Sequence, residues 1–83
     1  MMDEQPQRVF SLTDAQVGQH LRFLSVRGGR RLVHRLTELG LTPGIKIILL
    51  QDSGGPLLLS VRNSRLALGR GLAQKMDVVR LPK

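Results

Sequence analysis

Nine glycines and four prolines divide this chain of 83 residues into apolar segments of strand length. The longest uninterrupted apolar run, Ile47–Leu50, is far shorter than the ~18 residues that a membrane-spanning helix needs. A chain of this size supplies one small hydrophobic core. We therefore expect a single domain at residues 10–83. Before it we expect a flexible segment at residues 1–9, in which charge, glutamine and proline show no periodicity.

The clearest local prediction is a β-hairpin near the middle of the chain. Residues 45–52 and 57–62 are rich in leucine and β-branched residues. The segment between them, Ser53-Gly54-Gly55-Pro56, is typical of a four-residue turn. Alternate positions in both segments are apolar, so one face of the hairpin is expected in the core.

Residues 19–27 form a predicted strand that bends. Leu21 and Phe23 lie on one face of this strand, but the apolar series then slips by one position at Leu24. An inserted residue, a β-bulge, returns the following side chains to the core and bends the strand. Strong bending suits a small barrel.

A helix is predicted directly after this strand, at residues 30–39. Its apolar residues have the spacing of one helix face: Leu32, Val33, Leu36 and Leu39. We expect all of them except Val33 to be buried against the hairpin strands, because they form the only apolar stripe of the helix.

The rest of the chain adds short elements. Gly40 is placed to end the helix in a left-handed conformation, and Pro43-Gly44 to form a turn. A short strand at 65–68, one or two helical turns at 70–76 and a last strand at 77–81 follow. The predicted fold class is therefore mainly β: a small five-stranded barrel with one short helix after the first strand and a helical turn before the last.

Charge and composition narrow the function. Thirteen basic and six acidic residues give a net charge of +7, which attracts nucleic acid, anionic lipid or an acidic protein surface. The chain has two Phe and no Trp or Tyr, so it lacks the aromatic platforms on which bases stack. It has no cysteine, which excludes disulfides and sulfur-bound zinc and favours a cytosolic location.

No residue pattern of an enzyme is present, and we expect no enzymatic activity. The six acidic residues are scattered, no serine lies in a nucleophile elbow, and the glycines lack the spacing of phosphate-binding loops. His34 and Glu38, four residues apart on the predicted helix, have the spacing of two metal ligands. A closed metal site needs four ligands, so we expect no metal site and no cofactor, only adventitious binding of a divalent metal by this surface pair.

The end of the predicted helix, the turns and the strand after them follow one another in a specific order. The residues that mark this order are Leu36, Leu39-Gly40-Leu41, Pro43-Gly44, Gly55-Pro56 and Ser64–Leu68. This order resembles the ferrous iron transport protein A family over residues 11–81. The resemblance implies an SH3-like barrel in the bacterial cytosol, beside a membrane ferrous iron transporter that carries its own GTPase domain. A similar module is the C-terminal domain of iron-dependent repressors. Because the chain starts at its own methionine with no helix-turn-helix, we expect a free-standing accessory protein.

The expected partner is the cytosolic domain of that transporter, whose activity the protein would modulate from the inner face of the membrane. The candidate partner-binding residues combine the densest basic group with an apolar turn: Arg27, Arg30, Arg31, Arg35, Leu41 and Pro43. Two alternatives stay open for them, a merely solvated basic face and a role of Leu41 in closing the helix. We expect a monomer or a weak homodimer. The alternative function is a basic barrel that binds nucleic acid or serves as a regulator module.

Overall fold

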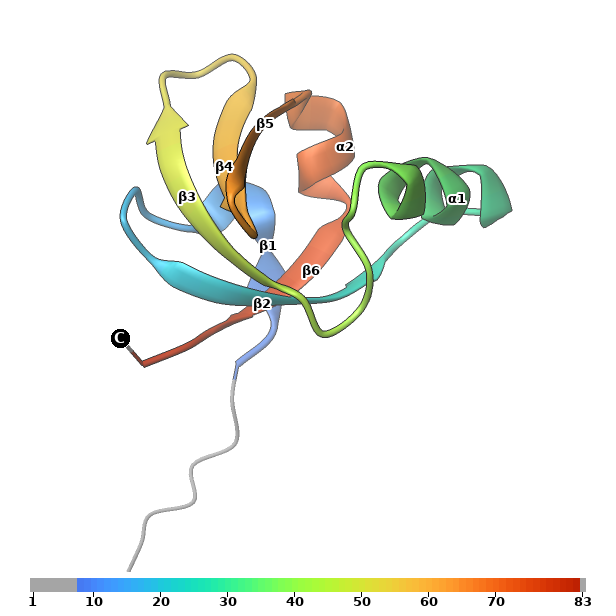
Figure 1. The fold of residues 1–83 in the computed structure, drawn as a ribbon, viewed down its shortest axis with the longest axis horizontal. Helices are drawn as coiled ribbons and strands as arrows, with labels where there is room; N and C mark the ends of the chain where they lie inside the picture. The colour runs from blue at the N-terminus through green and yellow to red at the C-terminus, as the bar shows by residue number, and fades with distance from the viewer. Residues whose placement is uncertain (1–7, 83) are drawn as a thin grey trace, which may run out of the picture.

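The computed structural model describes residues 8–82, which form a curved antiparallel sheet and two short helices (Figure 1). The elements along the chain are β1 (Phe10–Ser11), the 3-10 helix η1 (Leu12–Asp14), β2 (His20–Val26), α1 (Arg30–Glu38), β3 (Lys46–Asp52), β4 (Leu57–Val61), β5 (Ser64–Leu68), α2 (Arg70–Gln74) and β6 (Met76–Arg80). The strand order in the sheet is β1-β6-β2-β3-β4-β5. The predicted class, mainly β with a helix after the long first strand and a helical turn before the last, is confirmed.

The sheet has six strands where the sequence predicted five. The additional strand, β1, has only two residues, and Phe10 and Ser11 pair with Val78 and Asp77 of β6. A two-residue strand shows no alternation, so the sequence pattern could not reveal it. Most of the flexible segment predicted at residues 1–9 lies outside the described residues. None of the helices within residues 8–82 is long and apolar enough to cross a membrane.

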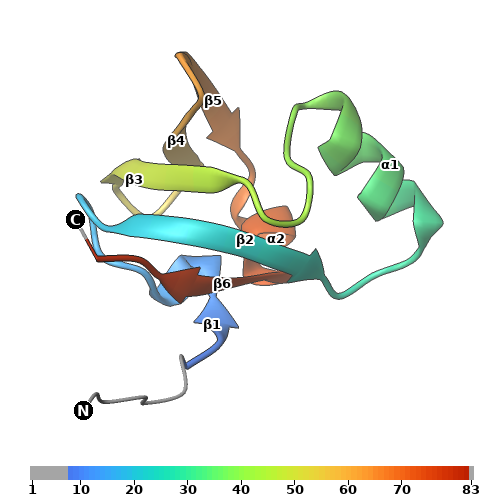
Figure 2. The same ribbon diagram turned by 60° about the horizontal axis from the view of Figure 1, so that its bottom comes forward.

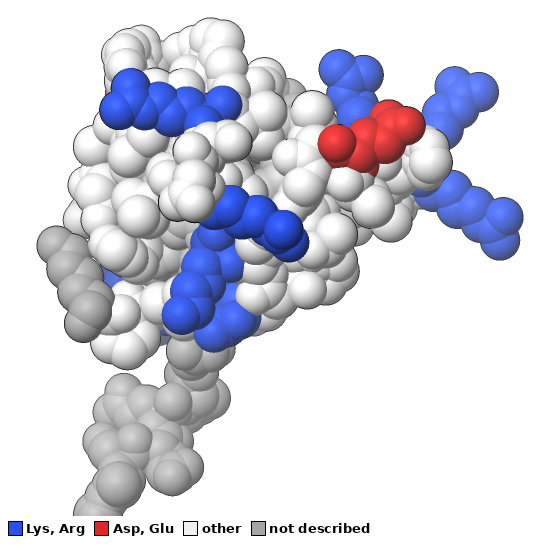
Figure 3. All heavy atoms as spheres, viewed as in Figure 1, with Lys and Arg blue, Asp and Glu red and all other residues white. Residues whose placement is uncertain are grey.

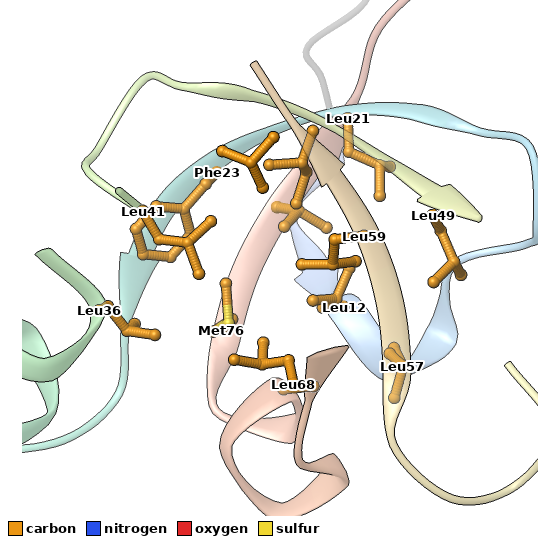
Figure 4. Packing of buried hydrophobic residues seen from close by; sticks show 14 residues of the cluster. Leu12, Leu21, Phe23, Leu36, Leu41, Leu49, Leu57, Leu59, Leu68 and Met76 are labelled. Atoms are coloured by element: carbon orange, nitrogen blue, oxygen red, sulfur yellow. The ribbon is translucent and has the colours of Figure 1, made fainter. Parts of the chain in front are cut away.

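One hydrophobic core fills the inside of the curved sheet (Figure 4). Its fully buried side chains come from every strand except β1, from all three helical segments and from the loop after α1. They are Leu12, Leu21, Phe23, Leu36, Leu41, Ile47, Leu49, Leu57, Leu59, Leu68, Ala73, Met76 and Val78. The predicted apolar face of the β3–β4 hairpin is therefore in the core. No polar or charged residue is buried among residues 8–82. The core is therefore held by apolar packing alone.

Two bulges bend the sheet. The register of β2 against β6 shifts between Phe23 and Ser25, which confirms the bulge predicted at Leu24. The register of β3 against β4 shifts between Leu49 and Gln51. This second bulge was not predicted, because the continuous apolar run around it hides the slip in alternation. Figure 2 shows β2 as a long curved strand between β3 and β6.

Helix α1 is less buried than the sequence predicted. Only Leu36 is buried, at 1% exposure, whereas Leu32 is half-buried and Leu39 is 39% exposed. The prediction that all three are buried is therefore right for Leu36, partly right for Leu32 and wrong for Leu39. Leu36 lies beside Phe23 of β2 and Leu41. Figure 1 shows α1 to one side of the curved sheet and not across it, so only part of its apolar stripe meets the core.

The end of α1 is fixed by a Schellman motif, as Gly40 predicted. Gly40 has φ +88°, its N–H donates to the Thr37 carbonyl at 3.0 Å, and the Leu41 N–H donates to the Leu36 carbonyl at 2.8 Å. The following turn is also confirmed, since Gly44 has φ +94° after Pro43. These turns direct the chain from the exposed helix back into β3.

Candidate functional site

Three arginines of α1 have no partner in the described chain. Arg30, Arg31 and Arg35 are exposed, and their guanidinium groups make no hydrogen bond or ion pair within residues 8–82. Three of the four acidic residues in that range are already paired with a basic side chain: Glu38, Asp52 and Asp77. In Figure 3, Lys and Arg side chains project from the end of the molecule where α1 lies in Figure 1. None of the ion pairs within residues 8–82 involves these three arginines, so their charges remain available to an anion from outside.

The start of α1 departs from the usual chemistry of helix N-termini. The N-cap, Gly29, provides no side-chain hydrogen bond, and the first turn contains Arg30 and Arg31 but no acidic residue. A helix carries partial positive charge at its N-terminus, so a cation there is unfavourable by about 0.3–1 kcal/mol. Local rules are broken in this way mostly at functional sites. Arg30 and Arg31 therefore do not stabilise the helix through its dipole.

A small apolar groove lies between α1 and β2, with a volume of about 130 Å³. Buried side chains form its floor: Phe23, Leu36 and Leu41. Figure 4 shows these three side chains together at the α1 end of the core. The rim is formed by more exposed residues: Val33, Thr37 and Pro43. Val33 is 48% exposed, so a large apolar side chain at the rim is left open to solvent.

The predicted partner-binding residues divide into three groups. Arg30, Arg31 and Arg35 lie together on α1, and Pro43 is exposed at the groove rim. Arg27 is already engaged, because its Nε donates to Asp77 Oδ1 at 3.1 Å and its Nη2 to the Gln74 carbonyl at 2.6 Å.

Leu41 is 1% exposed and forms part of the groove floor, which fits the alternative that it closes the helix end. Its contact with a partner stays a prediction. Val33 was not among the predicted site residues, although its place beside the expected apolar stripe was visible in the sequence.

A second, larger groove lies on the outer face of the sheet. Its volume is about 560 Å³, and its lining combines apolar residues of β3 with His20, Lys46 and Arg62. Lys46 and Arg62 are exposed, so this surface is basic as well. It offers a matched comparison for experiments on the arginines of α1.

The predicted pair His34 and Glu38 is present on the outer side of α1. The His34 Nε2 lies 3.2 Å from Glu38 Oε2, and both side chains are largely exposed. Within residues 8–82, no group of three or more His, Cys, Asp or Glu side chains is arranged to hold a metal ion.

We expect the protein in dilute solution to bind Zn²⁺ or Fe²⁺ no more tightly than an exposed pair of two ligands allows, because a closed site needs four. Isothermal titration calorimetry of each metal measures this affinity. A stoichiometric, submicromolar site that disappears in His34→Ala would contradict the expectation. The matched control is Glu38→Gln, which keeps the imidazole and removes only the carboxylate.

Comparisons with known proteins support a single family. The FeoA domain family matches residues 10–80. The relative named "Putative Fe(2+) transport protein A" of Methanocaldococcus jannaschii is 30% identical over 70 residues, which are 84% of this chain and 85% of the relative. The crystal structure of an iron uptake regulatory protein (FeoA) has a TM-score of 0.81 and 35% identity, and the alignment covers 89% of this chain and 99% of that one.

The same fold also occurs in a repressor. A manganese-dependent transcriptional repressor has a TM-score of 0.80 at 15% identity, over 93% of this chain and 44% of the repressor. At this identity the likeness concerns the fold alone. The predicted fold and the predicted family resemblance are both confirmed by these matches.

Proposed function

Because the chain belongs to the FeoA domain family, we propose that it is a non-enzymatic accessory protein of ferrous iron uptake. In this proposal it acts in the cytoplasm, where it binds the cytosolic domain of a membrane ferrous iron transporter and modulates its activity. The observation that carries the proposal is the set of three unpartnered arginines on α1, Arg30, Arg31 and Arg35. Guanidinium groups pair well with carboxylates, so this surface suits an acidic protein domain.

The proposal is tested by the rate of association with the purified cytosolic domain of the transporter. The double variant Arg31→Glu/Arg35→Glu is expected to bind about tenfold more slowly or worse at low salt, because opposite charge accelerates encounter. The difference should shrink at physiological salt, where the Debye length is about 8 Å. Folding should be almost unaffected, since exposed helix charges contribute only a few tenths of a kcal/mol.

A matched control separates a local docking surface from net charge. The double variant Lys46→Glu/Arg62→Glu changes the outer groove of the sheet and, like the α1 variant, lowers the net charge from +7 to +3, since each Arg or Lys to Glu change subtracts two. Docking through α1 predicts the larger loss for the α1 variant. Equal losses in the two variants, or none in either, would show that α1 is merely a solvated basic face. If the wild-type protein fails to bind the domain at all, the proposed function is wrong.

The alternative function, nucleic-acid binding, has less support. Phe23 is buried and Phe10 packs partly buried against the core, so neither ring is available as a stacking platform. A filter-binding titration compares the two functions directly. Submicromolar affinity for DNA or RNA with a steep salt dependence would favour the alternative, whereas weak nonspecific binding is expected of any protein with this charge.

A further inference from the structure

We infer that the groove between α1 and β2 is a docking site for an acidic segment of a partner protein that inserts one large apolar side chain between Val33 and Pro43. The identity of the partner rests on the proposed function, whereas the chemistry of the occupant is argued from the groove itself. Its volume of about 130 Å³ is close to that of a cavity that admits one benzene ring, about 150 Å³. It therefore accommodates a single Leu, Met or Phe side chain.

The groove is open because of how α1 is held. Leu36 is the only buried residue of the helix, so the helix contacts the barrel through a narrow line. Val33, one turn before Thr37 on the same flank, lies beside this line and stays 48% exposed at the rim. An apolar side chain inserted here would cover Val33 and contact the buried floor of Phe23 and Leu41. Burial of this surface on binding is favourable, at about 25 cal/mol per Å² of apolar area.

The charge around the groove specifies an acidic occupant. Arg30 precedes Val33 by three residues, so it lies on the same face of α1, one turn from the rim. Its guanidinium has no partner in the described chain. The groove-lining residues themselves carry no charge, so the charge next to the groove comes from Arg30. A segment with Asp or Glu about one turn from its apolar residue would place a carboxylate at Arg30.

An amphipathic helix fits this arrangement best. On a partner helix, an acidic residue three or four positions from the apolar residue lies on the same face. Arg30 and Val33 are three positions apart on α1, so the two pairs of side chains can meet. A groove of about 130 Å³ admits one side chain, whereas an extended peptide uses pockets for several alternate side chains. It also lacks the exposed aromatic walls that proline-rich peptides need, since Phe23 is buried in its floor. The inferred mode is a helix that inserts one anchor side chain into a groove.

The first experiment needs no transporter. The full ¹⁵N-labelled protein is titrated with a synthetic helical peptide that has one leucine flanked by glutamates, and amide shifts are followed by NMR. The expected result is a set of shifts confined to Val33, Thr37 and Gly44, with at least fivefold weaker binding when the peptide leucine is replaced by alanine. Shifts spread over all basic surfaces, or no dependence on the leucine, would overturn the inference.

The second experiment uses the cytosolic domain of the transporter and pairs of variants on the same helix. Val33→Gln is expected to weaken binding about fivefold to tenfold, because it removes apolar contact at the rim. Leu39→Gln is the control, since Leu39 is similarly exposed but does not line the groove. Likewise, Arg30→Glu should weaken binding more than Arg35→Glu, although both change the charge by the same amount. Gln and Glu are good helix formers, so both pairs are expected to stay folded.

The outcomes distinguish this inference from the proposed function. If the wild-type protein binds the transporter domain but the members of each variant pair behave alike, the groove is not the docking site and the proposed function stands. If the wild-type protein does not bind the domain, the proposed function fails and the peptide titration alone decides the inference. If the protein instead self-associates with rising concentration and Val33→Gln abolishes this, the occupant is a second copy of the chain and the inference is wrong.

Discussion

The substitution Leu36→Ala is expected to lower the free energy of unfolding by about 2–5 kcal/mol, the range for truncating a buried leucine. Leu36 is 1% exposed, is the only buried residue of α1, and contributes to the core and to the floor of the groove. A domain of this size has a total stability of only about 4–12 kcal/mol. The variant is therefore expected to lose a large share of its free energy of unfolding. The packing of α1 against the sheet is expected to loosen.

Urea denaturation of the wild-type protein and the variant measures this loss. The matched control is Val33→Ala on the same helix, which is expected to cost less than about 1 kcal/mol because Val33 is half exposed and alanine is the better helix former. If Leu36→Ala cost no more than Val33→Ala, the helix would not be anchored to the barrel through Leu36. In that case, a loss of binding in Leu36→Ala could not be attributed to a change in the shape of the groove.

Elements whose structure depends on nearby residues were predicted well from the sequence. The β3–β4 hairpin follows from two apolar runs around Ser53-Gly54-Gly55-Pro56, and the end of α1 follows from Gly40. In each case, one short segment contains all the turn chemistry that the structure uses. The bulge at Leu24 was predictable for the same reason, because the slip in alternation occurs within one strand.

The burial of α1 was predicted less well, because it depends on tertiary position. A spacing of three and four residues defines the apolar stripe of a helix, but it does not say how much of the stripe meets the sheet. Leu39, the last residue of the stripe, is the C-cap of α1 and stays 39% exposed, whereas Leu36 one turn earlier is buried. The second bulge, within the Ile47–Leu50 run, was missed because every residue there is apolar and no slip is visible.

The sequence predicted the charged residues of the candidate site but not the groove beside them. Arg30, Arg31 and Arg35 were recognised because the sequence itself groups them. The groove depends on Phe23 from β2 and Pro43 from the turn before β3, which only the tertiary fold brings beside Val33. The pairing of Arg27 with Asp77, 50 residues away, was equally invisible in the sequence, and it removes Arg27 from the set of unpartnered charges.

A long-range contact of the same kind connects the tip of the β3–β4 hairpin to α2. The Arg70 guanidinium forms an ion pair with Asp52, and its Nε donates to the carbonyl oxygens of Gly54 at 3.1 Å and Gly55 at 3.2 Å. Asp52 Oδ1 in turn accepts from the Gly54 N–H at 3.1 Å. One side chain thus holds the hairpin loop against the first residue of α2. This contact joins β3 to the segment that leads from β5 to β6.

The substitution Arg70→Met is therefore expected to lower the free energy of unfolding by about 1–2 kcal/mol. The side chain of Arg70 is 36% exposed, so the ion pair is partly screened by solvent and contributes less than a buried pair. Most of the loss comes from three hydrogen-bond acceptors that lose a charged donor. Methionine keeps the length and apolar stem of the side chain, so the experiment isolates the guanidinium.

Urea denaturation and hydrogen exchange of the Gly54 amide together measure this contribution. Arg65→Met, at an exposed arginine of β5 with no partner among the described residues, is the control and is expected to change stability by less than about 0.5 kcal/mol. Exchange at Gly54 should accelerate in Arg70→Met alone, because the loop opens locally before the domain unfolds. If both variants behaved like the wild-type protein, the hairpin backbone would hold the loop in place without the contacts of Arg70.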